Sequence, residues 1–299
     1  MRLAICLVCA GCGRVGFDTS DAPAAPDAHC TWSAFSTPAA LPGPVQSGAD
    51  DWSPSPTAGG TQIYFYTYRT TAFGKIYRAV RASVADPFGV ATPVTELDNP
   101  TSDQFSPTAT SDNLLLIYAD AATGAFKLMS ATRSSVGLPF DPPSQLANVN
   151  ASNAVDDLYP SISADGLRLV FGSTRVNGAQ AHLFETTRSD RAAAFATPRE
   201  LAEVAKPGSD DWSPTLSADA LDIFFSSNRG GPGGFDVYTS HRAAVDQPFA
   251  PPLLVPELSS PRDDVGLHLD PTGATMYLSY DAVVGGGNAE LDVATRSCN

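Results

Sequence analysis

The sequence has little positive charge, few histidines and no long hydrophobic run. Only 18 of its 299 residues are Lys or Arg, against 32 Asp or Glu, so the formal net charge is -14 and the pI is about 4.5. Such a charge repels nucleic acid and anionic lipid, so we expect no nucleic-acid partner. A membrane-spanning helix needs roughly 20 consecutive apolar residues, and no stretch of the sequence offers them. The four histidines lack the paired spacing of a zinc site.

Proline and glycine are abundant, with 25 and 24 residues respectively, and 43% of the chain is apolar. This composition is typical of a globular chain with many turns, and the length allows a sizeable core.

The N-terminus has the layout of an export signal. It reads "MRLAICLVCAGCGRVGFD", with one Arg, an apolar run from Leu3 to Ala10 and small residues before Cys12. The letters "CAGC" resemble the lipobox of bacterial lipoproteins, in which the signal is cut before a Cys that carries diacylglycerol. The resemblance implies a signal peptide at 1–11, lipidated Cys12, and a location in the bacterial cell envelope on the periplasmic side of a membrane or at the cell surface. The alternative is a secretory signal cut elsewhere, which would give a soluble protein.

Residues 12–30 contain the small, acidic and proline-bearing stretch "DTSDAPAAPDA", and we predict a disordered tether there. Cys30 and Cys298 then bracket the remaining sequence. In an oxidising compartment such a pair predicts a disulfide bond, with two free thiols as the alternative.

The pentapeptide "DDWSP" occurs at 50–54 and again at 210–214, with degenerate copies "DQFSP", "DDLYP" and "DDVGL" starting at 103, 156 and 263. The period is therefore 53 or 54 residues, which indicates a repeat architecture. Each repeat contains a hairpin signal such as "SADGLRLVF", a third apolar run that ends in Arg, and a fourth segment with Phe and Pro. Four short antiparallel strands repeated radially predict a propeller.

The segment "WSAFSTPAALPGPV", residues 32–45, matches the fourth-strand motif although it precedes the first repeat, and the fifth repeat stops after its third strand. We therefore predict an all-β, five-bladed β-propeller over residues 31–299, closed by the N-terminal strand joining the last blade.

The stretches "SPTLSADALDIFFSSNRGGPGGFDVYTS" and "YPSISADGLRLVFGSTR" resemble the WD40-like (PD40) repeats of the periplasmic TolB protein and related bacterial envelope proteins. The second and fifth repeats lack the Ser-x-Arg element of that pattern. The resemblance implies a propeller that acts as a binding scaffold.

Two acidic columns mark the repeat starts. The first consists of Asp50, Asp103, Asp156, Asp210 and Asp263, and the second of Asp51, Gln104, Asp157, Asp211 and Asp264. One hypothesis is an acidic ring at one mouth of the central channel, able to hold a cation such as calcium or a basic segment of a partner. The alternative is a fold-making task repeated in every blade, such as capping a turn or pairing with the Arg that ends the third strand.

A third column is hydroxylic except in the last repeat, where His268 stands as a possible ligand contact. It consists of Ser55, Thr108, Ser161, Thr215 and His268.

The first functional hypothesis is a monomeric, lipid-anchored scaffold for an envelope protein or a small ligand, without catalysis or cofactor. The second is a glycoside hydrolase with carboxylates in the central funnel. Its candidate residues, which break the repeat, are Asp120, Asp222, Glu185 and Glu290.

Overall fold

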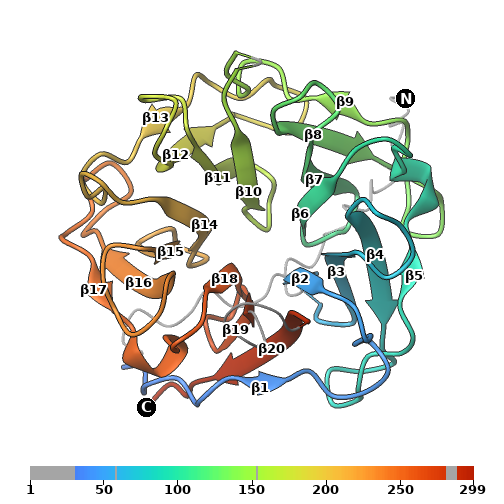
Figure 1. Cartoon of the computed structure of the whole chain (residues 1–299), viewed down its shortest axis with the longest axis horizontal. Coiled ribbons are helices and arrows are strands. Elements are labelled where there is room, and N and C mark those ends of the chain that lie inside the picture. Colours follow the sequence, from blue (N-terminus) through green and yellow to red (C-terminus); the bar gives the residue numbers. More distant parts are fainter. Residues whose placement is uncertain (1–30, 58, 153, 281–287) are drawn as a thin grey trace, which may run out of the picture.

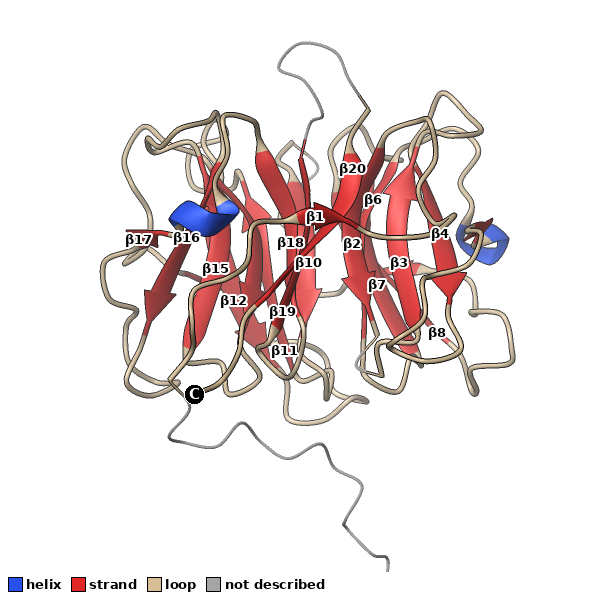
Figure 2. Cartoon of the chain, turned by 90° about the horizontal axis from the view of Figure 1, so that it is seen from below, coloured by secondary structure: helices blue, strands red, loops and turns tan. Residues whose placement is uncertain are grey.

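The computed structural model describes residues 31–57, 59–152, 154–280 and 288–299. Within them the chain forms five four-stranded antiparallel sheets arranged as blades around one axis (Figure 1). Seen from the side, the strands run between the two faces of the disc and loops cover both faces (Figure 2). The prediction of a five-bladed propeller is confirmed.

The strands of the blades are as follows. Blade 1 contains β2 (Asp51–Pro56), β3 (Gln62–Thr67), β4 (Lys75–Val80) and β5 (Thr92–Pro93), and is followed by the 3-10 turn η1 (Thr95–Leu97). Blade 2 contains β6 (Gln104–Ala109), β7 (Leu115–Asp120), β8 (Lys127–Thr132) and β9 (Ser144–Gln145). Blade 3 contains β10 (Asp157–Ile162), β11 (Arg168–Ser173), β12 (His182–Thr187) and β13 (Arg199–Glu200). Blade 4 contains β14 (Asp211–Leu216), β15 (Asp222–Ser227), β16 (Asp236–His241) and β17 (Leu253–Leu254), followed by η2 (Pro256–Leu258). Blade 5 contains β18 (Asp264–Leu269), β19 (Thr275–Tyr280), β20 (Glu290–Thr295) and β1 (Ala39–Ala40).

Each innermost strand carries a bulge, and in blades 1 to 4 this bulge explains the proline inside the strand. The pairing of β2 with β3 shifts register between Trp52 and Ser55, and the other four inner strands shift at the equivalent place. The residue before the proline has a positive φ, for example 53° at Ser53. A bulge releases the backbone from the ladder, so Pro54, which has no N–H to donate, is tolerated in a central strand.

The apolar core lies between neighbouring blades. One cluster joins Ile117 and Leu128 of blade 2 to Leu169 and Phe171 of blade 3, all with no measurable exposure. Every sheet is thus packed on both faces by its neighbours, so the blades depend on one another for burial.

The arginine that follows each third strand binds the turn between the first and second strands of the same blade and packs on a ring of the segment before or in its fourth strand. In blade 4, Nε of Arg242 donates to the carbonyl of Ala220 at 2.8 Å, and the guanidinium lies 4.4 Å from the ring centre of Phe249. The equivalent arginines repeat both contacts, and they are Arg81, Arg133, Arg188 and Arg296. These arginines therefore stabilise turns and do not pair with the acidic columns.

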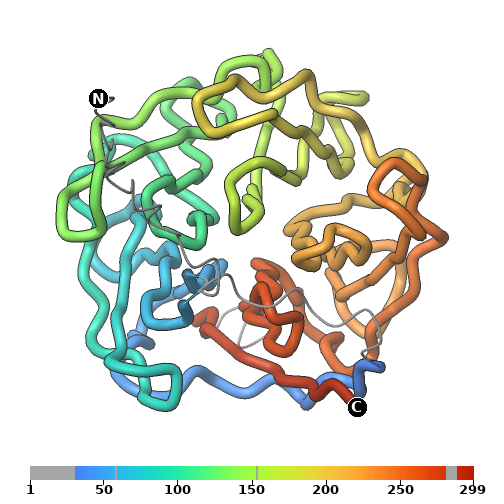
Figure 3. Tube along the Cα trace, turned by 180° about the vertical axis from the view of Figure 1, so that it is seen from behind, coloured from blue at the N-terminus to red at the C-terminus, as the bar shows by residue number. Residues whose placement is uncertain are grey.

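The N-terminal segment closes the ring, as predicted. β1 pairs with β20 through Ala39 and Val293, so the first and the last strand of the described chain share blade 5 (Figures 1 and 3). The guanidinium of Arg296 lies 4.4 Å from the ring of Trp32 and 4.6 Å from that of Phe35.

Trp32 also forms an isolated antiparallel bridge with Cys298. Cys30 lies outside the described residues, together with the predicted signal peptide, Cys12 and most of the tether. The Cys30–Cys298 bond therefore stays a prediction.

Replacing Cys298 by serine is expected to lower the melting temperature under oxidising conditions, because a bond across so long a loop contributes roughly 5 kcal/mol on the chain-entropy model. The far-UV spectrum should not change. The same difference between parent and variant should vanish when a reductant is added, and an unchanged melting temperature without reductant would count against the bond.

Candidate functional site

The first acidic column fastens each blade to the one before it. Oδ1 of Asp103 accepts the backbone N–H of Gly74 at 2.7 Å, and the N–H of Gln104 donates to the carbonyl of the same glycine at 2.9 Å. The four other members make the same clamp across their blade boundaries, and they are Asp50, Asp156, Asp210 and Asp263. A recurring side chain thus performs one fold-making task five times.

The second acidic column is buried. In blades 1, 3 and 4 its carboxylates pair with the arginine of the Ser-x-Arg element and not with the arginine that ends the third strand. Its members Asp51, Gln104, Asp157, Asp211 and Asp264 are at most 1% exposed. In blade 3, Oδ1 of Asp157 lies 2.5 Å from Nη2 of Arg175, the arginine of the Ser-x-Arg element. Blades 1 and 4 repeat the pair as Asp51–Arg69 and Asp211–Arg229.

The two columns therefore serve the contacts between and within blades. In the described part of the chain, no three His, Cys, Asp or Glu side chains come together in a way that could hold a metal ion. A cation held by the acidic columns has no support from this geometry, and a basic partner segment at them stays a prediction.

Blade 5 keeps the buried acid but has no arginine at the Ser-x-Arg position. Asp264 instead accepts the N–H and the hydroxyl of Ser260, at 2.8 and 2.9 Å. Burial raises the pKa of Asp264 to about 7, with the charges of Asp236 and Asp263 adding to the effect. Burial, with the charge of Glu290, likewise raises the pKa of Asp292 to about 7.

The free energy of unfolding is expected to depend on pH because of the raised pKa of Asp264. Between pH 4 and 7 the folded protein binds this proton more tightly than the unfolded chain does, so stability falls as the pH rises through that window. Asp264→Asn should make this decline shallower by about 1 kcal/mol per pH unit, the share of one group, while the share of Asp292 remains. Urea unfolding at several pH values measures it, with the exposed Asp246→Asn as control. Parallel pH profiles for parent and Asp264→Asn would contradict the assignment.

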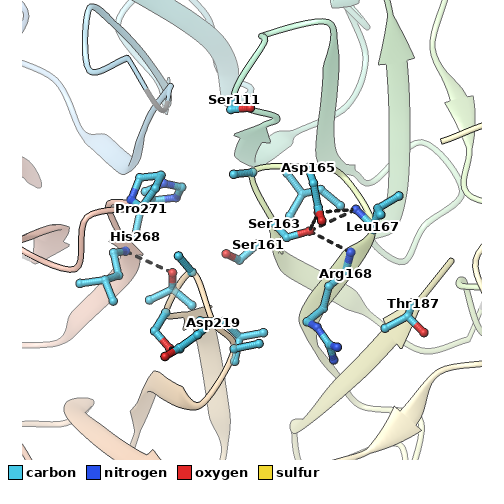
Figure 4. A pocket seen from close by; sticks show the side chains of 18 of the residues that line it. Ser111, Ser161, Ser163, Asp165, Leu167, Arg168, Thr187, Asp219, His268 and Pro271 are labelled. Atoms are coloured by element: carbon cyan, nitrogen blue, oxygen red, sulfur yellow. Dashed lines mark hydrogen bonds between the residues drawn. The ribbon is translucent and has the colours of Figure 1, made fainter. Parts of the chain in front are cut away.

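A large cavity lies on the opposite face from the acidic columns. It has a volume of about 560 Å³ and is walled by the inner strands and first turns of blades 3 and 4, with shorter contributions from the other blades (Figure 4). We call it the funnel. Hydroxyl groups dominate its polar lining, among them Ser111, Ser161, Ser163, Thr187 and Ser217.

The funnel does not continue as an open channel. The centre of the ring holds only about 20 Å³ of free space, between the bulges of the five inner strands. Hydrogen bonds between neighbouring inner strands narrow the centre further, for example the one between Ser53 Oγ and Ser106 Oγ, 3.3 Å long. That volume is close to what one water molecule needs, so a ligand in the funnel would be stopped at the bulges.

His268 lies where the funnel meets the closed centre, and it lines both. Its Nδ1 is 3.3 Å from the hydroxyl of Ser55. Burial lowers the pKa of His268 to about 4, so the imidazole is neutral at pH 7. The predicted ligand contact is thus placed at the base of the cavity as a neutral hydrogen-bonding group, together with Ser161 and Thr215 of its column.

Asp165 and Asp219 are two carboxylates in the funnel wall. Oδ1 of Asp165 accepts the hydroxyl of Ser163 at 2.6 Å and the N–H of Leu167 at 2.9 Å. Asp219 makes the same two contacts in blade 4 with Ser217 and Leu221. Asp112 of blade 2 repeats the arrangement with its own turn. These carboxylates stabilise turns, which is what a residue recurring in several blades is expected to do.

The carboxylates considered for catalysis lie outside the funnel. Asp120 accepts the hydroxyl of Ser102 at 2.8 Å, and Asp222 lies 2.8 Å from Nδ1 of His241. Glu185 is held by arginines, and Glu290 begins β20 with its side chain exposed. The structure does not bring the four together.

Sequence reasoning missed Arg168, and it identified Arg188 only as the arginine that ends a third strand, without placing it in the funnel. Nη2 of Arg188 is buried without a hydrogen-bond partner, whereas Nη1 of Arg168 binds Glu185. Arg168 could have been found, because it occupies the first position of a second strand where the other repeats carry Gln, Leu, Asp and Thr.

The fold and this cavity define the protein as a five-bladed β-propeller with a one-sided funnel. No helix in the described ranges is long and apolar enough to cross a membrane.

No protein-family model matches the sequence, and a search of curated proteins finds no match. Among solved structures, TolB from Acinetobacter baumannii is similar with 14% identity and a TM-score of 0.51, over 83% of this chain and 55% of that one. This chain therefore spans about half the length of that TolB. The Bacillus subtilis arabinanase Arb43A matches with 13% identity and a TM-score of 0.57, over 82% and 95% of the two chains. The catalytic domain of the Coprinopsis cinerea GH62 α-L-arabinofuranosidase matches with 11% identity and a TM-score of 0.56, over 90% and 98%. At these identities the similarity shows the fold, which both non-enzymatic and hydrolytic propellers share.

Proposed function

We propose that the protein is a monomeric, lipid-anchored scaffold of the bacterial envelope that holds a segment of an envelope protein or a small ligand in its funnel without changing it chemically. The lipobox resemblance of residues 9–12 supports the anchor, and the five near-equivalent blades support a rigid disc. Binding at the end of a preformed cavity with a few convergent polar groups is a common use of such a site.

The observation that carries the proposal is the state of the funnel carboxylates. A glycoside hydrolase needs an acid and a second carboxylate free to act on opposite sides of the bond. Asp165 and Asp219 instead accept hydrogen bonds within their own turns. The described lining also contains no Trp, Tyr or Phe on which a sugar ring could stack. Hydroxyls, arginines and a neutral imidazole suit recognition better than hydrolysis.

The test is photo-crosslinking in the native envelope. A photo-reactive residue at Ser111, in the funnel, should give a crosslinked product of defined mass, and the same residue at the exposed Ser135 should not. Ser111→Trp should reduce co-purification of that product, because the indole obstructs part of the cavity. Equal products from both positions would overturn the proposed site.

The enzyme remains the second candidate because similar propellers include arabinan- and arabinoside-degrading enzymes by their names. Incubation with arabinan and arabinoxylan, followed by a reducing-sugar assay, is expected to show no release. Release by the parent that is lost in both Asp165→Asn and Asp219→Asn would replace the scaffold proposal with hydrolysis in the funnel.

A further inference from the structure

Three blades contain an internal arginine site of constant construction. In blade 4, Nη2 of Arg229 lies 2.5 Å from Asp211 Oδ1 and donates to the carbonyl of Val204 at 2.8 Å. Its Nε donates to the hydroxyl of Ser227 at 2.8 Å, and the guanidinium lies 5.0 Å from the ring centre of Tyr238. Carboxylate, carbonyl, hydroxyl and aromatic face therefore surround one guanidinium.

Blades 1 and 3 repeat this site with the same four kinds of partner. Arg69 is held by Asp51, the carbonyl of Val45, the hydroxyl of Thr67 and the ring of Tyr77. Arg175 is held by Asp157, the carbonyl of Val149, the hydroxyl of Ser173 and the ring of Phe184. The fold thus builds the same guanidinium site wherever the Ser-x-Arg element is present.

Blade 2 has the site without the arginine. Ala122 stands at the arginine position, two residues after the end of β7, as Arg69 does after β3. A cavity of about 290 Å³ is present there. It is lined by Ala122 and by the residues equivalent to the partners of the arginines, namely Leu97, Tyr118, Asp120 and Met129. We call this cavity the blade-2 socket.

The blade-2 socket still has a carboxylate at a strand position, but on the second strand of the blade and not on the first. The carboxylate of β2, β10 and β14 is replaced in β6 by Gln104, whose Nε2 donates to the carbonyl of Leu97. The hydroxyl of the other second strands is replaced by the carboxylate of Asp120. The hydrogen bonds described for Asp120, from Ser102, Ala122 and Asn99, all reach Oδ1.

The surroundings of the socket are acidic, too. Glu96 and Asp98 line it, and Asp98 lies 3.4 Å from Nζ of Lys75. Lys127 lines the cavity with its stem, but its ammonium binds the carbonyls of Ser152 and Val155 and the carboxylate of Asp157 in blade 3.

We propose that the blade-2 socket binds an alkylguanidinium group, the chemistry of an arginine side chain, supplied from outside the chain. Asp120 is the charged acceptor, and Tyr118 and Met129 form the apolar wall against which the planar group lies. A carboxylate pairs well with the forked donors of guanidinium, and an aromatic face adds a cation–π contribution. The site is separate from the funnel and independent of its function.

Methionine NMR can test this at the site itself. The chain has 3 methionines, Met1, Met129 and Met276, and only Met129 lines the socket. In the full chain labelled at methionine methyl groups, the Met129 signal should shift when L-arginine or ethylguanidinium is titrated in, while Met276 should not respond. A blocked pentapeptide, acetyl-Gly-Gly-Arg-Gly-Gly-amide, distinguishes a protein source from free arginine, and its citrulline analogue is the neutral control.

Two variants define the result. Asp120→Asn should weaken guanidinium binding at least tenfold, and Ala122→Arg should abolish it and raise the melting temperature, because the chain then fills its own socket. Arg175→Ala opens the equivalent site in blade 3, so isothermal titration calorimetry should detect one further ethylguanidinium bound by this variant, which serves as a positive control. Failure of the parent to respond to guanidinium, or an equal response to the citrulline peptide, would overturn the proposal. If only the arginine peptide binds, the socket recognises an arginine of a protein partner. If the peptide and free L-arginine both bind, the socket accepts any exposed arginine side chain.

Discussion

Replacing Glu185 by alanine is expected to lower the free energy of unfolding by about 3 to 5 kcal/mol, the range for breaking a buried ion pair. Glu185 Oε1 and Oε2 lie 2.9 and 3.1 Å from the two terminal nitrogens of Arg242 of the next blade, whose side chain has no exposure. Arg168 and Arg199 bind the same carboxylate. Removing it would leave the Arg242 guanidinium buried without a carboxylate partner.

The pKa of Glu185 supports this assignment. Burial alone would raise it, but the hydrogen bonds and charge of Arg242, followed by Arg168, outweigh burial and lower the pKa below its usual value. The carboxylate is therefore charged, and its stabilising effect should fade only when the pH falls through that lowered value.

Urea unfolding of Glu185→Ala against Glu203→Ala measures the effect. Glu203 pairs with the same Arg199, whose side chain is 52% exposed, so its loss should cost less than about 1 kcal/mol. Similar losses for both variants would show that the junction between blades 3 and 4 does not depend on Glu185.

Deletion of the closing segment is expected to have the largest effect of all. A chain that begins at Ser47 lacks β1 and the side chains of Phe35, Leu41 and Val45, which are at most 7% exposed. Burying three such side chains contributes roughly 5 to 9 kcal/mol. Loss of this segment would also leave β20 as an unpaired edge strand and would remove the contact between Arg296 and Trp32. We expect a chain that is unfolded or self-associated.

The matched control begins at Cys30 and so lacks only the predicted signal and tether. Size-exclusion chromatography and thermal unfolding of the two truncated proteins test the closure. A monomeric, cooperatively melting protein that begins at Ser47 would show that the ring is stable without its N-terminal strand.

Several features of the fold could be predicted because they are repeated in the sequence. The period of 53 or 54 residues, the hairpin signals and the matching segment at 32–45 gave the number of blades and the closure. These follow from local pattern, since alternation and turn residues act over a few positions and each copy strengthens the same inference.

The roles of individual carboxylates could not be predicted in this way. Asp50 and Asp51 are adjacent in sequence, yet one clamps the previous blade and the other holds Arg69 within its own. Alternate residues of a strand point to opposite faces of the sheet. The atoms that they contact there belong to segments far away in the sequence, so the contacts depend on how those segments twist and pack. The acidic columns therefore suggested a ring where the structure has two sets of separate contacts.

For this protein the sequence by itself determined five blades, their order and their closing strand, because every repeat contains the same alternating strands and turn residues. Only the tertiary structure decided that the first turns of blades 3 and 4 enclose a funnel, and that the missing arginine of blade 2 leaves a cavity lined by Asp120. Empty space is a property of how neighbouring side chains fill a volume, and no single stretch of sequence contains that information.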